Sequence, residues 1–389
     1  MLTGNKGEWS EIYVFLKLLA DGKLNAADAN LNAIPDVYYP IIKILRQEGA
    51  SKREFEINGN ITVIDGNTNK VLLSVPISEF VQKSQELFKF FKNAIGRSFS
   101  FPEIESFINN IDVKSLAALK SDKADIRVVV HDLNTGLKPM LGFSIKSMIG
   151  GDSTLFNSAA GTNFIFKISN PSGAAINLNE FNKATLHLAQ ESVKSKTTSR
   201  ISKITLRLNE LEKLNFNINF QKIQSDNLQL NLTLIDSQLP EILAFLVYTK
   251  YKKGKSKLID LLHEINFANP LGFDLSKGHP FYEYKIKNFL TENALGMTPE
   301  TVWTGIYDAT GGIIIVKESG ELVCYHIYNK NEFQDYLIHN TKLEQASTSE
   351  DDNNPGFSKT IKSKPYKYGW VYEENGELFI KLNLQIRFT

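Results

Sequence analysis

The chain has 389 residues, of which 42% are hydrophobic and 22% are charged, and this composition excludes a disordered chain and allows two or three compact units. The single cysteine, Cys324, excludes an intramolecular disulfide and a thiolate zinc cluster, and the histidines show no metal-ligand spacing. The net charge of +1 gives no sign of the strongly basic surface that nucleic-acid-binding domains usually carry.

The first half of the chain alternates between helical and strand-like patterns. Apolar residues at helical spacing predict a helix over residues 8–19 and a second short helix over 41–45. Residues 54–74 are typical of strands around a turn at Asp65-Gly66-Asn67, and residues 79–95 predict another helix. Two further strand-like runs, 125–131 and 140–147, are joined by a loop rich in turn residues. They predict a β-hairpin, or two close neighbours in one sheet.

The second half is less regular. Helical patterns cover residues 184–192, 206–214 and 238–248, and strand-like alternation covers 302–326 around Gly311-Gly312. Residues 345–357 contain almost no apolar side chains and predict a loop. The polar and basic stretch 194–202 marks the expected seam between a first domain, residues 1–193, and a second, residues 194–389.

Lysines cluster in two stretches that contain no acid, residues 248–257 and 358–367. Each stretch predicts either a solvated face or a DNA contact, and a solvated face is the commoner use of such a run. The longest apolar run, residues 242–248, is too short to cross a bilayer, and the first thirty residues lack a leader-like pattern. A cytoplasmic protein without a membrane partner is therefore expected.

Chemistry-bearing residues lie on the two strands of the predicted hairpin. Asp125 begins one strand, and Ser144 and Lys146 lie in the other. Because side chains alternate along a strand, Ser144 and Lys146 share one face, while Phe143 and Ile145 point into the core. A carboxylate beside a lysine suits metal-assisted hydrolysis of a phosphodiester, in which a metal activates water and neutralises phosphate charge.

The commoner explanation for an aspartate and a lysine on strands is a polar face that merely meets water. Two features favour the functional interpretation. A lysine between apolar strand residues is uncommon unless a partner holds it. In addition, the stretch Gly150-Gly151-Asp152-Ser153-Thr154 follows Lys146 directly and offers small residues and backbone amides that can approach a phosphate.

Five runs carry a resemblance to a known family: Gly4–Tyr13, Gly96–Ser100, Ala124–Arg127, Gly142–Ser147 with Thr162–Phe164, and Lys381–Phe388. Together they resemble the HpaII group of type II restriction endonucleases. The resemblance spans most of the chain and is densest in residues 1–30 and 96–165.

The resemblance implies an α/β (α+β) fold with a PD-(D/E)xK restriction-endonuclease-like core, a mixed central sheet flanked by helices, and additional recognition elements. It also implies Mg²⁺-dependent cleavage of double-stranded DNA at a short palindrome containing CCGG, with a cognate DNA methyltransferase as a genetic partner. In such a core the residue matching Asp125 holds the metal, and the one matching Lys146 assists the water. A glutamate on the first helix, here Glu11, often joins them. Monomer and homodimer both remain open.

Ser144 departs from the usual pattern of this fold, which has an acid two residues before the lysine. A hydroxyl binds a metal weakly, so the Ser144 hydroxyl is expected to contact a water. Some CCGG-cutting relatives with this serine supply a glutamate further along, but residues 159–161 contain none. Either Glu11 or Asp152 completes the site, or it uses fewer carboxylates; Glu11 is favoured. The expected catalytic residues are Asp125, Ser144, Lys146 and Glu11, and the expected metal ligands are Asp125, Glu11 and Asp152.

The expected DNA-binding residues are small residues after the hairpin and basic residues from other segments: Ser153, Thr154, Arg97, Lys194, Lys196, Arg200 and Lys203. Arg200 has the most DNA-like surroundings, and arginine can bind guanine through two hydrogen bonds, although phosphate contact or ordinary surface charge is the commoner explanation. Two other functions stay open. The chain could be a structure-selective nuclease with the same core, or a non-catalytic DNA-binding protein on a degenerate core.

Overall fold

The chain folds into two compact units, and the segments of the two units alternate along the sequence. The structure, a computed structural model, describes residues 1–117, 124–133, 135–171, 173, 176–185, 202–345 and 368–389. Unit 1 comprises residues 1–153, 294–296 and 305–336, and unit 2 comprises residues 154–293, 297–304 and 337–389. This division differs from the expected boundary after residue 193, a residue that lies outside the described part of the chain. The chain leaves unit 1 and later returns to add two strands to its sheet.

A nine-stranded mixed sheet forms the centre of unit 1. Its spatial order is β1 (Lys23–Ala27), β12 (Leu322–His326), β11 (Gly312–Val316), β7 (Met140–Ser147), β6 (Ile126–Val130), β2 (Ala33–Glu48), β3 (Ser51–Asn58), β4 (Asn60–Asp65) and β5 (Lys70–Val75). β11 runs parallel to β7 and β1 runs parallel to β12, whereas the other neighbours are antiparallel. β1 also pairs with the first half of β2. The expected mixed α/β class is therefore confirmed.

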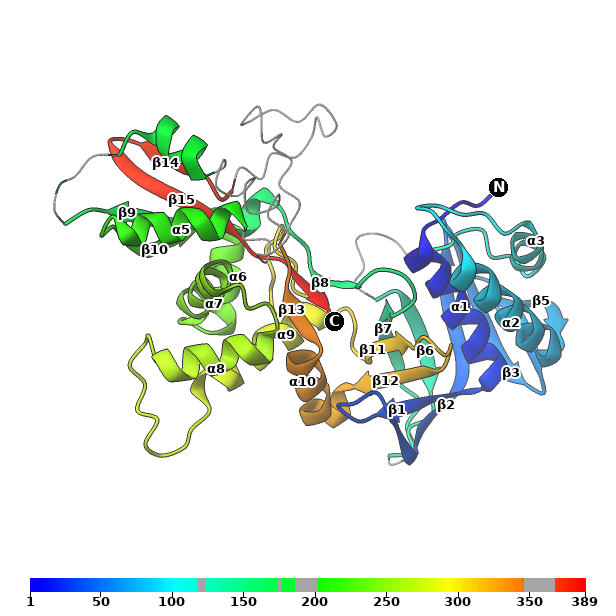
Figure 1. Ribbon diagram of the computed structural model, residues 1–389. Helices are drawn as coiled ribbons and strands as arrows, with labels where there is room; N and C mark the ends of the chain where they lie inside the picture. Colours follow the sequence, from blue (N-terminus) through cyan, green and yellow to red (C-terminus); the bar gives the residue numbers. More distant parts are fainter. Residues whose placement is uncertain (118–123, 134, 172, 174–175, 186–201, 346–367) are drawn as a thin grey trace. The chain divides into compact units, whose positions relative to one another are not determined.

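Helices α1 (Lys6–Asp21) and α2 (Ile77–Asn93) run side by side in unit 1, with α3 (Pro102–Asn110) next to α2 (Figure 1). α1 begins at a capping box, in which Asn5 accepts from the Glu8 backbone and the Glu8 carboxylate accepts from the Asn5 backbone. It ends at Gly22, whose φ of 66° is left-handed. One core joins the buried residues of α1 to Phe143, Ile145 and Ile314 of the sheet.

Most of the elements expected in unit 1 are confirmed. The helices at 8–19 and 79–95 correspond to α1 and α2, the strands at 54–74 correspond to β3, β4 and β5, and the runs at 125–131 and 140–147 form the antiparallel pair β6 and β7. The short helix expected at 41–45 is wrong, because these residues lie in β2 and pair with β6 and β3. The β-branched Ile41, Ile42 and Ile44 suit a strand bonded on both edges. Strands at 302–326 are confined to β11 and β12.

Unit 2 contains two smaller antiparallel sheets and most of the helices that the structure describes. One sheet has the order β10 (Asn217–Ile223), β9 (Asn163–Ser169), β15 (Glu377–Asn383), β14 (Val371–Glu374), and the other β13 (Thr341–Leu343), β16 (Ile386–Phe388), β8 (Thr154–Phe156). Its helices include α5 (Lys203–Lys213), α6 (Asp226–Ile235), α7 (Leu239–Lys253), α8 (Leu258–Ala268) and α9 (Phe281–Leu295). α10 (Lys330–His339) begins in unit 1 and ends in unit 2. α5 and α7 confirm the helices expected at 206–214 and 238–248.

Several expectations concern residues outside the described part of the chain. Most of the loop at 345–357 and most of the helix at 184–192 belong there, as does the whole lysine run at 358–367. Within the described residues, no single helix is long and apolar enough to span a membrane. α6 and α7 pass that test only as a pair, and their axes are bent by 112°.

Candidate active site

The β6–β7 hairpin brings Asp125 next to Ser144. Ile126, the first residue of β6, pairs with Phe143, and the backbone N–H of Asp125 donates to the Phe143 carbonyl at 2.8 Å. Ser144 follows Phe143 in β7, and its hydroxyl meets the Asp125 carboxylate.

Three side chains form one hydrogen-bonded row at this end of the hairpin. The Lys146 Nζ donates to Ser144 Oγ at 3.0 Å, and Ser144 Oγ donates to Asp125 Oδ2 at 3.1 Å. The backbone N–H of Ile145 also donates to Asp125 Oδ2, at 2.6 Å. The sequence pattern did not predict this backbone contact, which depends on the pairing of the two strands and not on the identity of the Ile145 side chain.

The row lies on a largely buried strand. Ser144 is only 3% exposed, whereas Asp125 and Lys146 are half-buried. The Ser144 hydroxyl therefore bonds to protein groups where a water contact was expected. Phe143 and Ile145 join the core with α1, so Ser144 and Lys146 belong to the other face of β7, next to Ile313 and Ile315 of β11.

Gly142 and Gly312 allow β7 and β11 to approach their neighbours closely. A Cβ at Gly142 would lie 2.5 Å from the Asp308 carbonyl oxygen, and a Cβ at Gly312 would lie 1.9 Å from the Tyr325 carbonyl oxygen. Gly312 also has a φ of 108°, which side chains rarely tolerate. A side chain at either position would push these backbones apart, so the two glycines allow the close packing around β7 and β11.

The expected metal ligands are not gathered into one cluster. No group of three or more His, Cys, Asp or Glu side chains that could hold a metal ion occurs among the described residues, which include Asp125, Glu11 and Asp152. Glu11 is half-buried in the second turn of α1, a helix that packs against β7 on the face opposite Ser144. Asp152 is exposed in the loop after β7. Glu8, the other first-helix glutamate, is engaged in the helix cap.

Asp125 alone still suits Mg²⁺. This ion prefers oxygen ligands, keeps several waters, and is often held by one or two carboxylates together with substrate phosphates. The two donors to Asp125 both reach Oδ2, and no described residue donates to Oδ1. The residues present therefore fit an ion that takes its remaining ligands from water and DNA.

The loop after β7 is shaped by contacts with α1. Gly150 has a φ of 109°, and a Cβ there would lie 2.9 Å from Cδ of Lys6. The Lys6 Nζ donates to the Lys92 carbonyl, and Ser153 Oγ donates to the Ser147 carbonyl at 2.7 Å. Lys6 is a basic residue near this loop that the motif analysis did not single out.

The expected DNA-binding residues are spread over both units. Arg97 is exposed after α2 in unit 1, Ser153 is the last residue of that segment of unit 1, and Thr154 begins β8 in unit 2. Lys203 begins α5 in unit 2, with its Nζ 5.6 Å from the Trp370 ring centroid. Lys194, Lys196 and Arg200 lie outside the described residues.

The lysine run at 248–257 is largely engaged within unit 2. Lys252 pairs with Glu212, and Lys253 and Lys255 both pair with Glu264. Lys250 is 9% exposed beside the Tyr251 ring, and burial lowers its pKa to about 8. These contacts favour a structural use of the run over a DNA contact.

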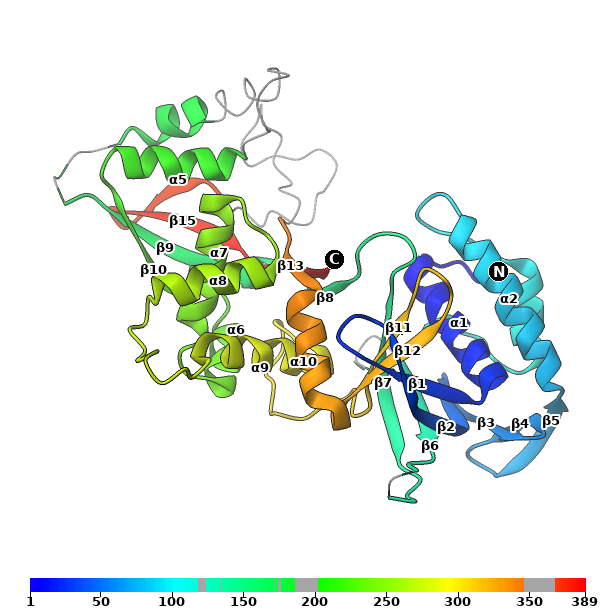
Figure 2. The same ribbon diagram turned by 60° about the horizontal axis from the view of Figure 1, so that its bottom comes forward.

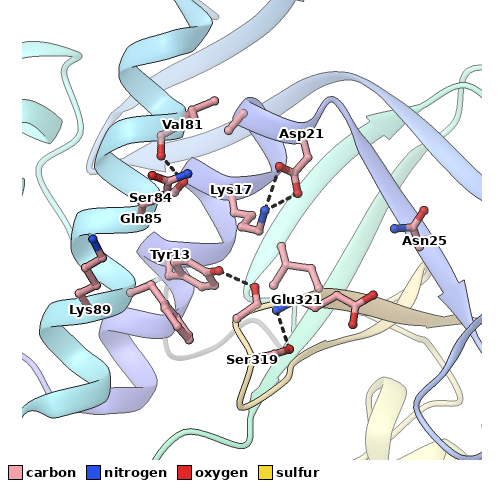
Figure 3. A pocket seen from close by; sticks show the side chains of 14 residues that line it. Tyr13, Lys17, Asp21, Asn25, Val81, Ser84, Gln85, Lys89, Ser319 and Glu321 are labelled. Atoms are coloured by element: carbon pink, nitrogen blue, oxygen red, sulfur yellow. Dashed lines mark hydrogen bonds and ion pairs between the residues drawn. The ribbon is translucent and has the colours of Figure 1, made fainter.

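A hollow of about 440 Å³ lies elsewhere in unit 1, among α1, α2, β1 and the turn between β11 and β12 (Figure 3). Several of its polar groups hold these elements together. The Tyr13 hydroxyl donates to the Gly320 carbonyl at 2.5 Å, and Lys17 pairs with Asp21. The site lies on other strands of this unit: in Figures 1 and 2, β7 lies between β11 and β6 in one sheet.

The comparisons with known proteins give the family. The model of the HpaII restriction endonuclease family matches residues 5–388. The chain belongs to the HpaII restriction endonuclease family. A relative from Haemophilus parainfluenzae, the type II restriction enzyme HpaII, is 42% identical over 387 residues, which cover 99% of this chain and 98% of the relative. No solved structure matches the chain.

Membership confirms the resemblance that the sequence runs carry. A member of the HpaII family is a type II restriction enzyme, so the expected enzyme class, a site-specific deoxyribonuclease, is confirmed as well. The match extends over both units, so the family's sequence pattern includes unit 2 as well as the Asp125 row.

Proposed function

We propose that this HpaII-family enzyme makes Mg²⁺-dependent double-strand breaks in DNA at a short palindrome containing CCGG. The hydrogen-bonded row of Asp125, Ser144 and Lys146 supports the proposal most, because it joins a carboxylate that suits a metal ion to a lysine in a chain of a restriction-enzyme family. Double-stranded DNA is then the substrate, and a cognate methyltransferase would protect the host's own sites.

We further propose that unit 1 contains a PD-(D/E)xK core. Three features support it: a first helix packed against the sheet, an antiparallel hairpin that carries Asp125 and Lys146, and a parallel neighbour, β11, beside the lysine strand. Unit 2 would then supply the recognition elements that sequence-specific cutting needs.

Each residue of the row has a separate task in this proposal. Asp125 Oδ1 would hold Mg²⁺, which when bound lowers the pKa of a bound water and offsets phosphate charge. The Lys146 ammonium would orient the attacking water and stabilise negative charge on the phosphate. The Lys146 side chain is half-buried and donates to Ser144. This contact keeps the ammonium near the Asp125 carboxylate without an ion pair between them.

Digestion of a plasmid of known sequence tests the function. The purified protein with Mg²⁺ should give discrete double-strand fragments that map to CCGG-containing palindromes, and omission of Mg²⁺ should leave the plasmid uncut. Cutting of branched DNA alone would identify a structure-selective nuclease instead. DNA binding without cutting in any divalent ion would identify a degenerate core.

Glu11→Gln and Asp152→Asn identify the residue that completes the site. We propose Glu11, because the family resemblance implies a glutamate on the first helix and this side chain is half-buried, whereas Asp152 is exposed. Glu11→Gln should lower the cleavage rate by about 100-fold or more, roughly 2.7 kcal/mol of transition-state stabilisation, and Asp152→Asn should have a much smaller effect. Single-turnover cleavage of a short duplex measures both. An inactive Asp152→Asn beside an active Glu11→Gln would assign the role to the loop.

A further inference from the structure

Ser144 lies between the two charged groups of the proposed site and bonds to both. Its hydroxyl accepts from Lys146 Nζ at 3.0 Å and donates to Asp125 Oδ2 at 3.1 Å. A hydroxyl has one proton and two acceptor sites, so these two bonds use it in one fixed direction. We infer that Ser144 is a positioning residue, which holds the Lys146 ammonium and the Asp125 carboxylate in fixed places while keeping them apart. The inference rests on the proposed function.

Separation of the two charges matters because opposite charges in a half-buried setting attract strongly. Lys146 forms no ion pair with Asp125, and its hydrogen bond within the described structure goes to Ser144. A direct contact with Asp125 Oδ1 would place the ammonium where a cation would bind. With the hydroxyl between them, the ammonium donates one proton to Ser144 and keeps two for water and phosphate, and Asp125 keeps Oδ1 for a cation.

Burial preserves the two hydrogen bonds of the Ser144 hydroxyl and favours serine over an acid at this position. Ser144 is 3% exposed, so water does not readily replace its partners, and hydrogen bonds to charged groups are stronger than those between neutral groups. An ionised carboxylate at this position could accept from Lys146 but could not donate to Asp125, and it would repel that carboxylate. Serine is therefore not simply a weaker form of the usual acid. It completes an arrangement in which β7 gives Asp125 two donors and no second negative charge.

The first test is a double-mutant cycle in the unfolding of the full chain, without metal or DNA. The variants are Ser144→Ala, Lys146→Met, which keeps most of the apolar stem, and the double substitution. If the hydroxyl holds the ammonium, the two effects on the unfolding equilibrium constant should be non-additive by about tenfold. Additive effects would overturn the inference whatever the cleavage activity, because the cycle needs no catalysis.

The second test separates positioning from a general structural role. Ser144→Ala should lower kcat by about tenfold to 100-fold with an unchanged KM for DNA, since the buried hydroxyl does not touch substrate. Ser144→Thr, which retains a hydroxyl, should recover most of that loss. Ser147→Ala is the matched control and should cleave normally. Ser147 lies on the same strand, and within the described part of the chain its Oγ accepts from the Ile149 backbone N–H and from no other group.

Two results would contradict the positioning role: wild-type kcat for Ser144→Ala, or a Ser144→Thr enzyme as slow as Ser144→Ala with unchanged Tm. Failure of the proposed function has a different signature. In that case the wild-type chain would not cut a CCGG-containing duplex in Mg²⁺, or Lys146→Met would cleave it as fast as wild type. The coupling between Ser144 and Lys146 in unfolding would remain measurable in either case.

Discussion

Lys146→Ala should abolish DNA cleavage and leave DNA binding almost unchanged. The ammonium is the only group of the proposed row that can donate to both a water and a phosphate oxygen, and removal of such a positioned group typically costs 100-fold or more in rate. Its loss should cost little stability, since Lys146 is half-buried and bonds to one neutral hydroxyl, a contact of about 1 kcal/mol. Single-turnover cleavage and a gel-shift titration of the same duplex measure the two effects.

Lys138→Ala provides the matched control for this substitution. Lys138 is exposed in the loop at the opposite end of the same hairpin, so its loss should leave both cleavage and folding close to normal. A Lys146→Ala enzyme that cuts within tenfold of wild type would remove Lys146 from the site. A similar loss in both variants would point to a general charge effect on DNA binding.

Asp125→Asn should eliminate Mg²⁺-dependent cutting while preserving the fold. The amide oxygen of asparagine can still accept from the Ile145 backbone and the Ser144 hydroxyl, so the hairpin geometry should persist. A neutral amide cannot offset the charge of Mg²⁺, however. The cleavage rate should therefore drop below detection across a wide Mg²⁺ titration, with an unchanged circular dichroism spectrum and a Tm near that of wild type.

Asp21→Asn controls for the loss of an aspartate in unit 1. Asp21 forms an ion pair with Lys17 at the end of α1, and such a pair near the surface contributes at most about 1 kcal/mol. This variant should cleave at the wild-type rate. Full activity of Asp125→Asn in Mg²⁺ would mean that another residue anchors the ion.

Short segments of the chain encode the local framework of the site. Turn residues between two alternating runs predicted the β6–β7 hairpin, and the two-residue period placed Ser144 and Lys146 on one face, with Phe143 and Ile145 in the core. The first helix was equally readable. Its apolar stripe lies within one segment, and the Asn5 cap and the Gly22 end that the structure adds are local features as well. The runs around these residues also carried the resemblance that the family match confirms.

Other features depend on contacts between segments far apart in the chain. Residues 41–45 had a pattern compatible with a helix, yet they form a strand because β3 and β6 bond to both edges of β2. β11 pairs with β7 through Gly312 and Phe143, so residues that follow the first two segments of unit 2 complete the sheet around the site. The lysines at 248–257 carried no local sign of their pairing with Glu212 and Glu264.

Ser144 shows most clearly which features short segments encode and which depend on contacts between distant segments. The sequence placed its side chain beside Lys146 and marked it as a departure from the usual acid, but it could not show what the hydroxyl contacts. That depended on the pairing of β6 with β7, which brings Asp125 within hydrogen-bonding distance of Ser144, and on the burial that excludes water from the hydroxyl. Periodicity and turn chemistry are encoded within short segments, so the sequence determines them. Partners across strands, and the exclusion of water around them, exist only once distant segments have packed, so the tertiary structure decides them.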